Sequence, residues 1–161
     1  MSVVSVEKDL ERLSLTLLAE FDAPIERVWQ LWADPRQLER WWGPPTHPAT
    51  VEKHELAAGG EVAYFMTGPE GERTFGWWRI DAVDPPTSLA FTDGFANPDG
   101  TPNADTPTTS VRMRLTAEDG TTRMELRFVF ESSDHMDRLE RWGAFAVYPQ
   151  SVGQMDALLV S

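Results

Sequence analysis

The chain has 161 residues, a formal net charge of −12 and no cysteine, which excludes disulfides, thiol catalysis and thiolate metal sites. Its length predicts a single domain over residues 1–161 with a substantial core, and its negative charge argues against nucleic acid or a membrane surface as a partner. No apolar stretch approaches the ~20 residues that span a bilayer and no signal peptide is recognised, so we expect a cytoplasmic protein.

The N-terminal part of the chain predicts one strand and then two short helices. Residues 1–11 are polar, and we expect them to be partly frayed. From Leu13 to Phe21, apolar side chains alternate with others at the period of a β-strand. A helix then begins at Pro24 and ends before Pro35, and a second short turn of helix carries Trp42. Helices this short are not stable alone in water, so they must pack against a sheet.

The middle of the chain predicts about six further strands. We place them at residues 46–56, 61–67, 73–83, around Leu89 and Phe91, at 109–117, and from Arg123 to Phe130. In the third of these, alternation turns Trp78, Ile80 and Ala82 inward. Trp77 is then either partly exposed or covered by the N-terminus.

The last third of the chain predicts a long loop and a long helix. Residues 93–108 are rich in Pro, Gly, Asn and Asp, and loops of this length are usually functional or mobile. Phe95 is the one large apolar residue of this loop and could plug a cavity mouth. The final helix begins at an N-cap, Ser133, and we expect Pro149 to kink or split it.

The sequence offers no recognisable catalytic set or metal site. Its three histidines (His47, His54 and His135) lack metal-ligand spacing, and we expect no metal and no cofactor. A carboxylate buried in an aromatic cavity would have a raised pKa. Glu55 and Glu61 are the nearest candidates by strand position, although we favour a solvated charge at a sheet edge for both.

Bulky apolar side chains are expected to converge between the sheet and the final helix. Core packing alone would explain them, and so would a mostly apolar ligand pocket. The residues predicted to line such a cavity are Trp42, Phe65, Trp78, Phe91, Phe95, Met113, Phe128, Trp142, Phe145 and Met155. Few inward positions are polar: Tyr64, Thr109 and Thr122.

Several short motifs follow one another along nearly the whole chain. They are Phe21-Asp22-Ala23-Pro24 with Val28-Trp29, Asp34-Pro35 with Leu38 and Trp41-Trp42, the Gly59-Gly60 turn, residues 80–86 before Leu89, and Gln154-Met155-Asp156-Ala157-Leu158-Leu159. In order and spacing they resemble the Hsp90-ATPase-activator-homologue-like (AHSA1-like) family of the START/Bet v 1-like (SRPBCC) superfamily. The resemblance implies an α+β helix-grip fold: a strongly bent antiparallel sheet of about 6–7 strands on a long C-terminal helix, with two short helices after the first strand.

The resemblance also implies candidate functions. Related folds hold lipids, sterols or polyketides, so we expect a binder of a hydrophobic or aromatic small molecule. A polyketide cyclase or aromatase-like enzyme, or a protein that sequesters a natural product, is the alternative. With no recognisable catalytic residues, we favour a binder over an enzyme.

Two expectations concern protein partners. In the eukaryotic activator of Hsp90 this domain follows a separate N-terminal domain, for which residues 1–12 leave no room. We therefore do not expect Hsp90 as a partner. An exposed Trp77 beside Phe75 would favour a homodimer.

Overall fold

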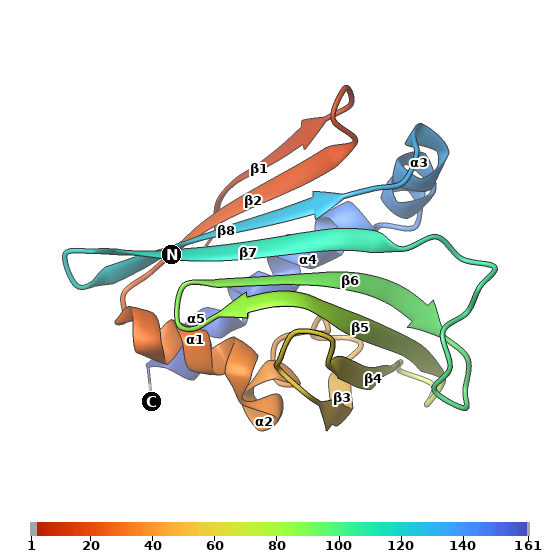
Figure 1. Ribbon diagram of the computed structural model, residues 1–161, viewed down its shortest axis with the longest axis horizontal. Helices are drawn as coiled ribbons and strands as arrows, with labels where there is room; N and C mark the ends of the chain where they lie inside the picture. Colours follow the sequence, from red (N-terminus) through yellow and green to blue (C-terminus); the bar gives the residue numbers. More distant parts are fainter. Residues whose placement is uncertain (1–2, 161) are drawn as a thin grey trace.

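The computed structural model describes residues 3–160, and within them one antiparallel sheet of eight strands curves around a series of C-terminal helices (Figure 1). The strand order is β1-β2-β8-β7-β6-β5-β4-β3. The elements in chain order are β1 Val3–Asp9, β2 Ser14–Phe21, α1 Ile25–Ala33, α2 Pro35–Leu38, β3 Ala49–His54, β4 Glu61–Thr67, β5 Arg73–Asp84, β6 Ser88–Ala96, β7 Thr109–Glu118, β8 Thr121–Val129, α3 Ser133–Arg141, α4 Ala144–Gly153 and α5 Met155–Leu159.

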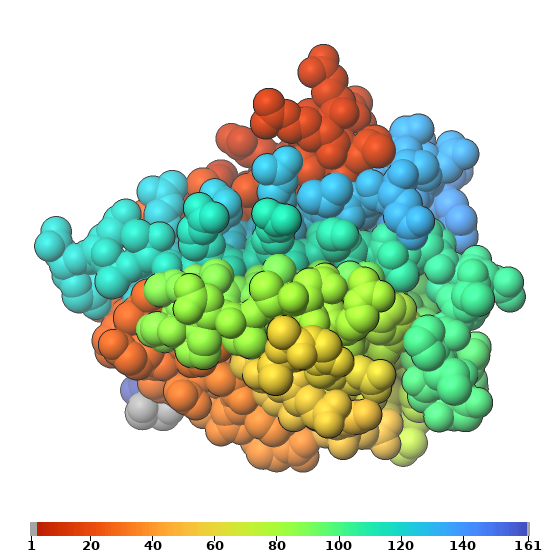
Figure 2. Space-filling model, viewed as in Figure 1, coloured from red at the N-terminus to blue at the C-terminus, as the bar shows by residue number. Residues whose placement is uncertain are grey.

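The sheet has one face turned to the helices and one face turned outward. In Figure 1, α4 and α5 lie behind the sheet, and α1 with α2 lies at its lower end. Along β7 and β8, buried residues alternate with exposed or half-buried ones, and Met113 pairs with Leu126 in the buried row. Figure 2 shows that the outer face of β5 to β8 forms the molecular surface in this view. The pattern of these strands therefore agrees with the predicted helix-grip fold.

An aromatic cluster holds the two short helices against the sheet. Trp32 of α1 contacts Trp41 edge-on, with ring centroids 4.7 Å apart. Trp78 of β5 stacks on Phe91 of β6 at 3.9 Å, and both are fully buried. The indole of Trp41 donates a hydrogen bond to the carbonyl of Leu31 at 2.8 Å, so its polar atom is satisfied inside the core.

The strand count exceeds the predicted six or seven because residues 3–9 form β1. We expected residues 1–11 to be partly frayed and predicted no strand there, whereas residues 3–9 form a regular strand; residues 1 and 2 lie outside the described part of the chain. The carboxylate of Asp9 accepts hydrogen bonds from the N–H groups of Glu11 and Arg12, which closes the turn into β2. β1 is an edge strand with little burial, so its apolar pattern is weak.

The C-terminal helix is interrupted at a different residue from the one predicted. Gly143, with φ of +87°, separates α3 from α4, whereas Pro149 lies inside α4. A left-handed glycine ends a helix readily because it has no Cβ. The N-cap of α3 is Ser132 and not Ser133: its hydroxyl accepts the N–H of His135 at 3.0 Å.

Two predictions about β5 and β6 also need correction. β6 continues to Ala96, so the first four residues of the predicted loop 93–108 belong to a strand. Ala82 is exposed and not inward, because the register shifts between Ile80 and Ala82. Trp77 is partly exposed, which is one of the two alternatives left open by its sequence position, and its indole donates to the carbonyl of Phe95 at 2.9 Å.

Candidate functional site

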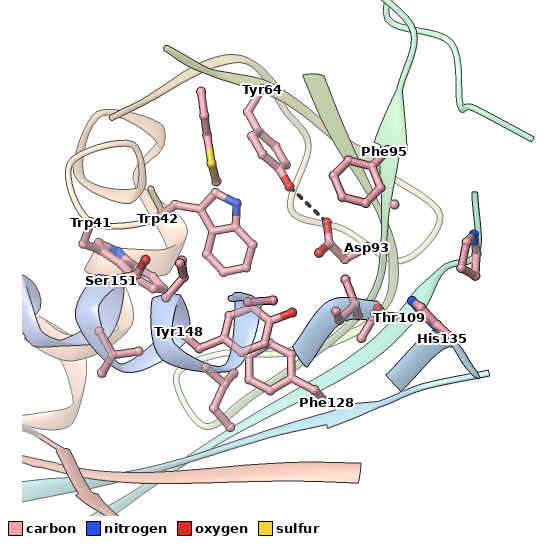
Figure 3. A pocket seen from close by; sticks show the side chains of 18 residues that line it. Trp41, Trp42, Tyr64, Asp93, Phe95, Thr109, Phe128, His135, Tyr148 and Ser151 are labelled. Atoms are coloured by element: carbon pink, nitrogen blue, oxygen red, sulfur yellow. Dashed lines mark hydrogen bonds between the residues drawn. The ribbon is translucent and has the colours of Figure 1, made fainter. Parts of the chain in front are cut away.

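A pocket of about 200 Å³ lies between the sheet and α4 (Figure 3). Its walls come from the segment after α2, from β4, β6, β7 and β8, and from α3 and α4. Residues far apart in sequence, such as Trp42, Asp93 and Tyr148, therefore line the same space. Most of the lining is aromatic or aliphatic, which is typical of small-molecule sites.

Aromatic rings form much of the pocket wall. Tyr148 of α4 stacks on Phe128 of β8, with ring centroids 4.1 Å apart and planes at 9°. Trp42 meets the ring of Tyr64 edge-on at 6.1 Å. Figure 3 shows Phe95 beyond Asp93, on the side of the pocket away from Trp42. A flat apolar ligand would therefore meet ring faces and edges from several elements.

The polar centre of the pocket is the pair formed by Tyr64 and Asp93. Tyr64 lies in β4 and Asp93 lies in β6. The hydroxyl of Tyr64 donates a hydrogen bond to Oδ1 of Asp93, with an O–O distance of 3.1 Å (Figure 3). Burial raises the pKa of the Asp93 carboxyl to about 7, although hydrogen bonds from Tyr64 and from the N–H of Gly94 oppose this shift. The carboxyl can therefore gain or lose its proton near neutral pH.

The other titratable groups of the pocket are neutral at pH 7. Burial, and then the charge of Asp93, raise the pKa of the hydroxyls of Tyr64 and Tyr148 above the usual value for tyrosine. Burial lowers the pKa of His135, whose Nδ1 accepts the N–H of Glu131 at 3.2 Å. The lining residues of the described chain include no Lys and no Arg. Among the described residues that line this pocket, Asp93 is thus the one group that can carry a charge at pH 7.

A further polar atom on the wall is the hydroxyl of Ser151. This residue lines the pocket from α4 and is only 4 % exposed. Its Oγ has no hydrogen-bond partner among residues 3–160. Since an unsatisfied buried hydroxyl costs free energy, a ligand polar group that reached it would be stabilised.

The position of Tyr64 depends on a glycine in the neighbouring strand. Gly76 pairs with Tyr64 across β4 and β5, and a Cβ at Gly76 would overlap the Tyr64 ring. We expect Gly76→Ala to displace that ring and to lower the free energy of unfolding by about 1–3 kcal/mol, as overpacking of a core does. Urea unfolding would measure the change. In a Tyr64→Leu background, Gly76→Ala should lower the free energy of unfolding by clearly less. An equal loss of stability in both backgrounds would contradict this explanation.

The structure brings three of the ten predicted cavity residues to the pocket: Trp42, Phe95 and Phe128. Four others are fully buried in the core without lining it, namely Trp78, Phe91, Met113 and Met155. Trp78, Phe91 and Met113 come from the inner face of the sheet and Met155 comes from α5, and all four belong to the hydrophobic core, as the core-packing alternative proposed.

The remaining three predicted residues lie away from the pocket. Phe65 points to the opposite face of β4 from Tyr64, where it packs on Phe75, because successive side chains of a strand alternate. Trp142 is 60 % exposed, since the helix that should have turned it inward is interrupted at the next residue. Phe145 stacks on Phe130, with ring centroids 5.5 Å apart.

The buried carboxylate is a residue that sequence reasoning missed. Glu55 and Glu61 are both exposed and pair with Lys53, which agrees with the solvated edge charges that we favoured for them. The composition of residues 93–108 predicts a loop there, whereas Asp93 lies in β6. Extending the alternation of Leu89 and Phe91 by two residues would have placed it on the inner face of β6.

The histidines have structural partners. His54 Nε2 lies 3.1 Å from the carbonyl of Trp32, and His47 Nδ1 lies 2.8 Å from the hydroxyl of Thr46. Within the described residues, no group of three His, Asp or Glu side chains is arranged to hold a metal ion. Nor is any helix in residues 3–160 long and apolar enough to cross a membrane.

The bent sheet, the two short helices after β2 and the C-terminal helices are consistent with the helix-grip fold of START/Bet v 1-like proteins. Residues 22–159 match the family model described as Activator of Hsp90 ATPase homolog 1-like protein. The chain therefore belongs to this family, as its motifs predicted.

Solved structures agree with this assignment. Protein Ms6760 from Mycobacterium smegmatis is 47 % identical, with a TM-score of 0.89 over 98 % of this chain and 96 % of that one. A protein from Arthrobacter aurescens is 45 % identical, with a TM-score of 0.95 over 99 % and 92 %. DynU16, a putative protein in the dynemicin biosynthetic locus, shares the fold alone, at 17 % identity and a TM-score of 0.62 over 89 % of this chain and 47 % of that one. No curated protein matches the chain.

Proposed function

We propose that this protein binds a small apolar or aromatic molecule in the pocket between the sheet and α4. The observation that carries the proposal is the pocket itself, which is lined mainly by aromatic and aliphatic side chains and has a volume of about 200 Å³. A core built only for stability would fill such a space, because each void costs packing contacts. An unfilled apolar space with a polar pair on one wall is the usual form of a ligand site.

The volume limits the size of the ligand. An engineered apolar cavity of about 150 Å³ in another protein binds benzene. A pocket of about 200 Å³ therefore fits one aromatic ring with a short substituent. The rings of Trp42, Phe128 and Tyr148 would contact its faces and edges, and the Tyr64–Asp93 pair would orient its polar group.

The proposal can be tested by filling the pocket from α4. Ala144 lines the pocket, whereas Ala146 is exposed on the same helix. We expect Ala144→Phe to weaken the binding of toluene or benzyl alcohol by at least about tenfold, or about 1.4 kcal/mol, because the new ring occupies the ligand volume. Titration followed by tryptophan fluorescence would measure this, since Trp41 and Trp42 line the site.

The matched control is Ala146→Phe, which adds the same ring outside the pocket. It should leave the affinity within about twofold of the wild-type value, a difference of less than about 0.5 kcal/mol. Equal binding by both variants, or no binding by the wild-type protein, would contradict the proposal.

An enzyme is the second candidate, and the Asp93 carboxyl favours it. A group with a pKa of about 7 suits general acid–base catalysis at neutral pH, and Tyr64 fixes its orientation. A cyclase or aromatase-like reaction on a bound ring would use such a group. Sequestration of a natural product would use the same pocket without turnover. Mass spectrometry of a ligand recovered after incubation separates these alternatives, because only an enzyme changes the ligand.

A further inference from the structure

We propose that the pocket selects aromatic molecules that carry a protonated amine, and that the ammonium group pairs with the carboxylate of Asp93. This inference rests on the proposed function and goes beyond it by naming the chemical class of the ligand. Three observations support it: the Asp93 carboxylate has no cationic partner within the described residues, aromatic rings surround it, and the other lining residues are uncharged at pH 7.

The first argument is that the Asp93 carboxylate lacks a cationic partner. It receives the hydroxyl of Tyr64 and the N–H of Gly94, which are both neutral donors. None of the ion pairs within residues 3–160 includes Asp93. A carboxylate has about four acceptor positions, so acceptor capacity remains for a donor inside the pocket. A ligand ammonium would supply both the missing donor and the missing charge.

The second argument is that aromatic rings surround this carboxylate. Trp42 and Tyr64 lie on its side of the pocket, and Tyr148 faces them from α4 (Figure 3). A cation within about 6 Å of a ring centroid is attracted by the negative face of the ring. Aromatic walls with one acidic group thus suit an organic cation better than a neutral or anionic ligand.

The third argument comes from the charges of every element around the pocket. β4 contributes Tyr64, β6 contributes Asp93, α3 contributes His135 and α4 contributes Tyr148, and the lining residues of β7 and β8 are not titratable. Both phenols and the imidazole are neutral at pH 7, for the reasons given above. A fatty acid or phosphate would therefore find no cation to pair with. The net charge of −12 also raises the local concentration of cations.

The pH dependence distinguishes an ammonium ligand from a neutral acceptor. An ammonium pairs with the ionised carboxylate, so its affinity should rise about tenfold from pH 6 to pH 8 as Asp93, with a pKa of about 7, loses its proton. A carbonyl ligand would instead accept a hydrogen bond from the protonated carboxyl. Its affinity would fall over the same range.

The test compares benzylamine, benzyl alcohol and toluene as probes, titrated into the protein of residues 1–161 at pH 6 and pH 8 by calorimetry. Benzylamine stays protonated throughout this range. We expect it to bind about ten- to twentyfold more tightly than benzyl alcohol at pH 8, and this preference should shrink about tenfold, to about twofold or less, at pH 6. In Asp93→Asn the preference should be close to one at both pH values.

The control variant is Asp105→Asn, which removes an exposed negative charge outside the pocket and should keep the preference. If benzyl alcohol and toluene bind but benzylamine has no advantage at pH 8, the inference fails and the proposed function stands. A preference that survives in Asp93→Asn, or that grows as the pH falls, also overturns the inference. If none of the three probes binds, both the inference and the proposed function fail.

Discussion

Asp93→Asn should raise the free energy of unfolding at pH 8 by up to about 4 kcal/mol and have its smallest effect near pH 4. The carboxyl has an ordinary pKa of 3.8 and a pKa of about 7 in the folded protein. The folded state therefore holds this proton more tightly than the unfolded state. The stabilising contribution of the protonated carboxyl is complete below pH 3.8 and is lost as the pH rises through 7. Asparagine keeps an oxygen for the Tyr64 hydroxyl but does not ionise.

Urea unfolding of both proteins at several pH values from 4 to 8 would measure this difference. Other titrating groups change both proteins alike, so the difference between them isolates residue 93. Asp105→Asn serves as the control, because Asp105 is exposed and its replacement should give no comparable trend. A variant that is less stable than the wild-type protein at pH 8 would show that the ionised carboxylate is stabilised in the fold, contrary to our interpretation of the pocket.

Trp78→Ala should lower the free energy of unfolding by about 3–5 kcal/mol. The side chain of Trp78, which belongs to β5, is fully buried. Its ring stacks on Phe91 at a centroid distance of 3.9 Å and meets Trp42 edge-on at 4.8 Å. Alanine would leave a cavity that these neighbouring rings cannot close. Because Trp42 also lines the pocket, the loss should loosen the pocket wall as well.

Trp142→Ala is the matched control for this prediction. Trp142 is 60 % exposed, and it contacts Phe95 and the guanidinium of Arg138 at the surface. Its replacement should cost less than about 1 kcal/mol, the range of an exposed cation–π contact. Denaturant unfolding compares the two variants directly. Similar losses for both would mean that the cluster around Trp78 does not carry the stability we assign to it.

The fold was largely predictable because apolar and polar side chains alternate along most of its strands. The clear alternation around Met113 and Leu126 predicted two strands joined by a hairpin turn, and the structure pairs these two strands, with Met113 opposite Leu126. The edge strand β1 was missed because its side chains gain little burial from the sheet. The break at Gly143 was missed because a proline, Pro149, looked like the stronger interruption of a helix.

The candidate site was predictable only in part. Trp42 and Phe128 were expected in it, since both lie on apolar faces that must turn toward the helix. Asp93 was not, because its segment has the composition of a loop while its backbone continues a strand. Tyr148 was also missed, because only tertiary packing decides that its ring stacks on Phe128.

The most direct test of ligand binding is a methyl NMR titration with toluene, using protein labelled at Met, Leu and Val methyl groups. We expect shift changes and intermolecular NOEs at the pocket residues Met66, Leu126 and Val152. The exposed Val4 and Val6 on the edge strand should not respond. NOEs confined to such exposed methyls, or no response from the pocket at saturating toluene, would contradict the proposal that this pocket binds a small apolar molecule.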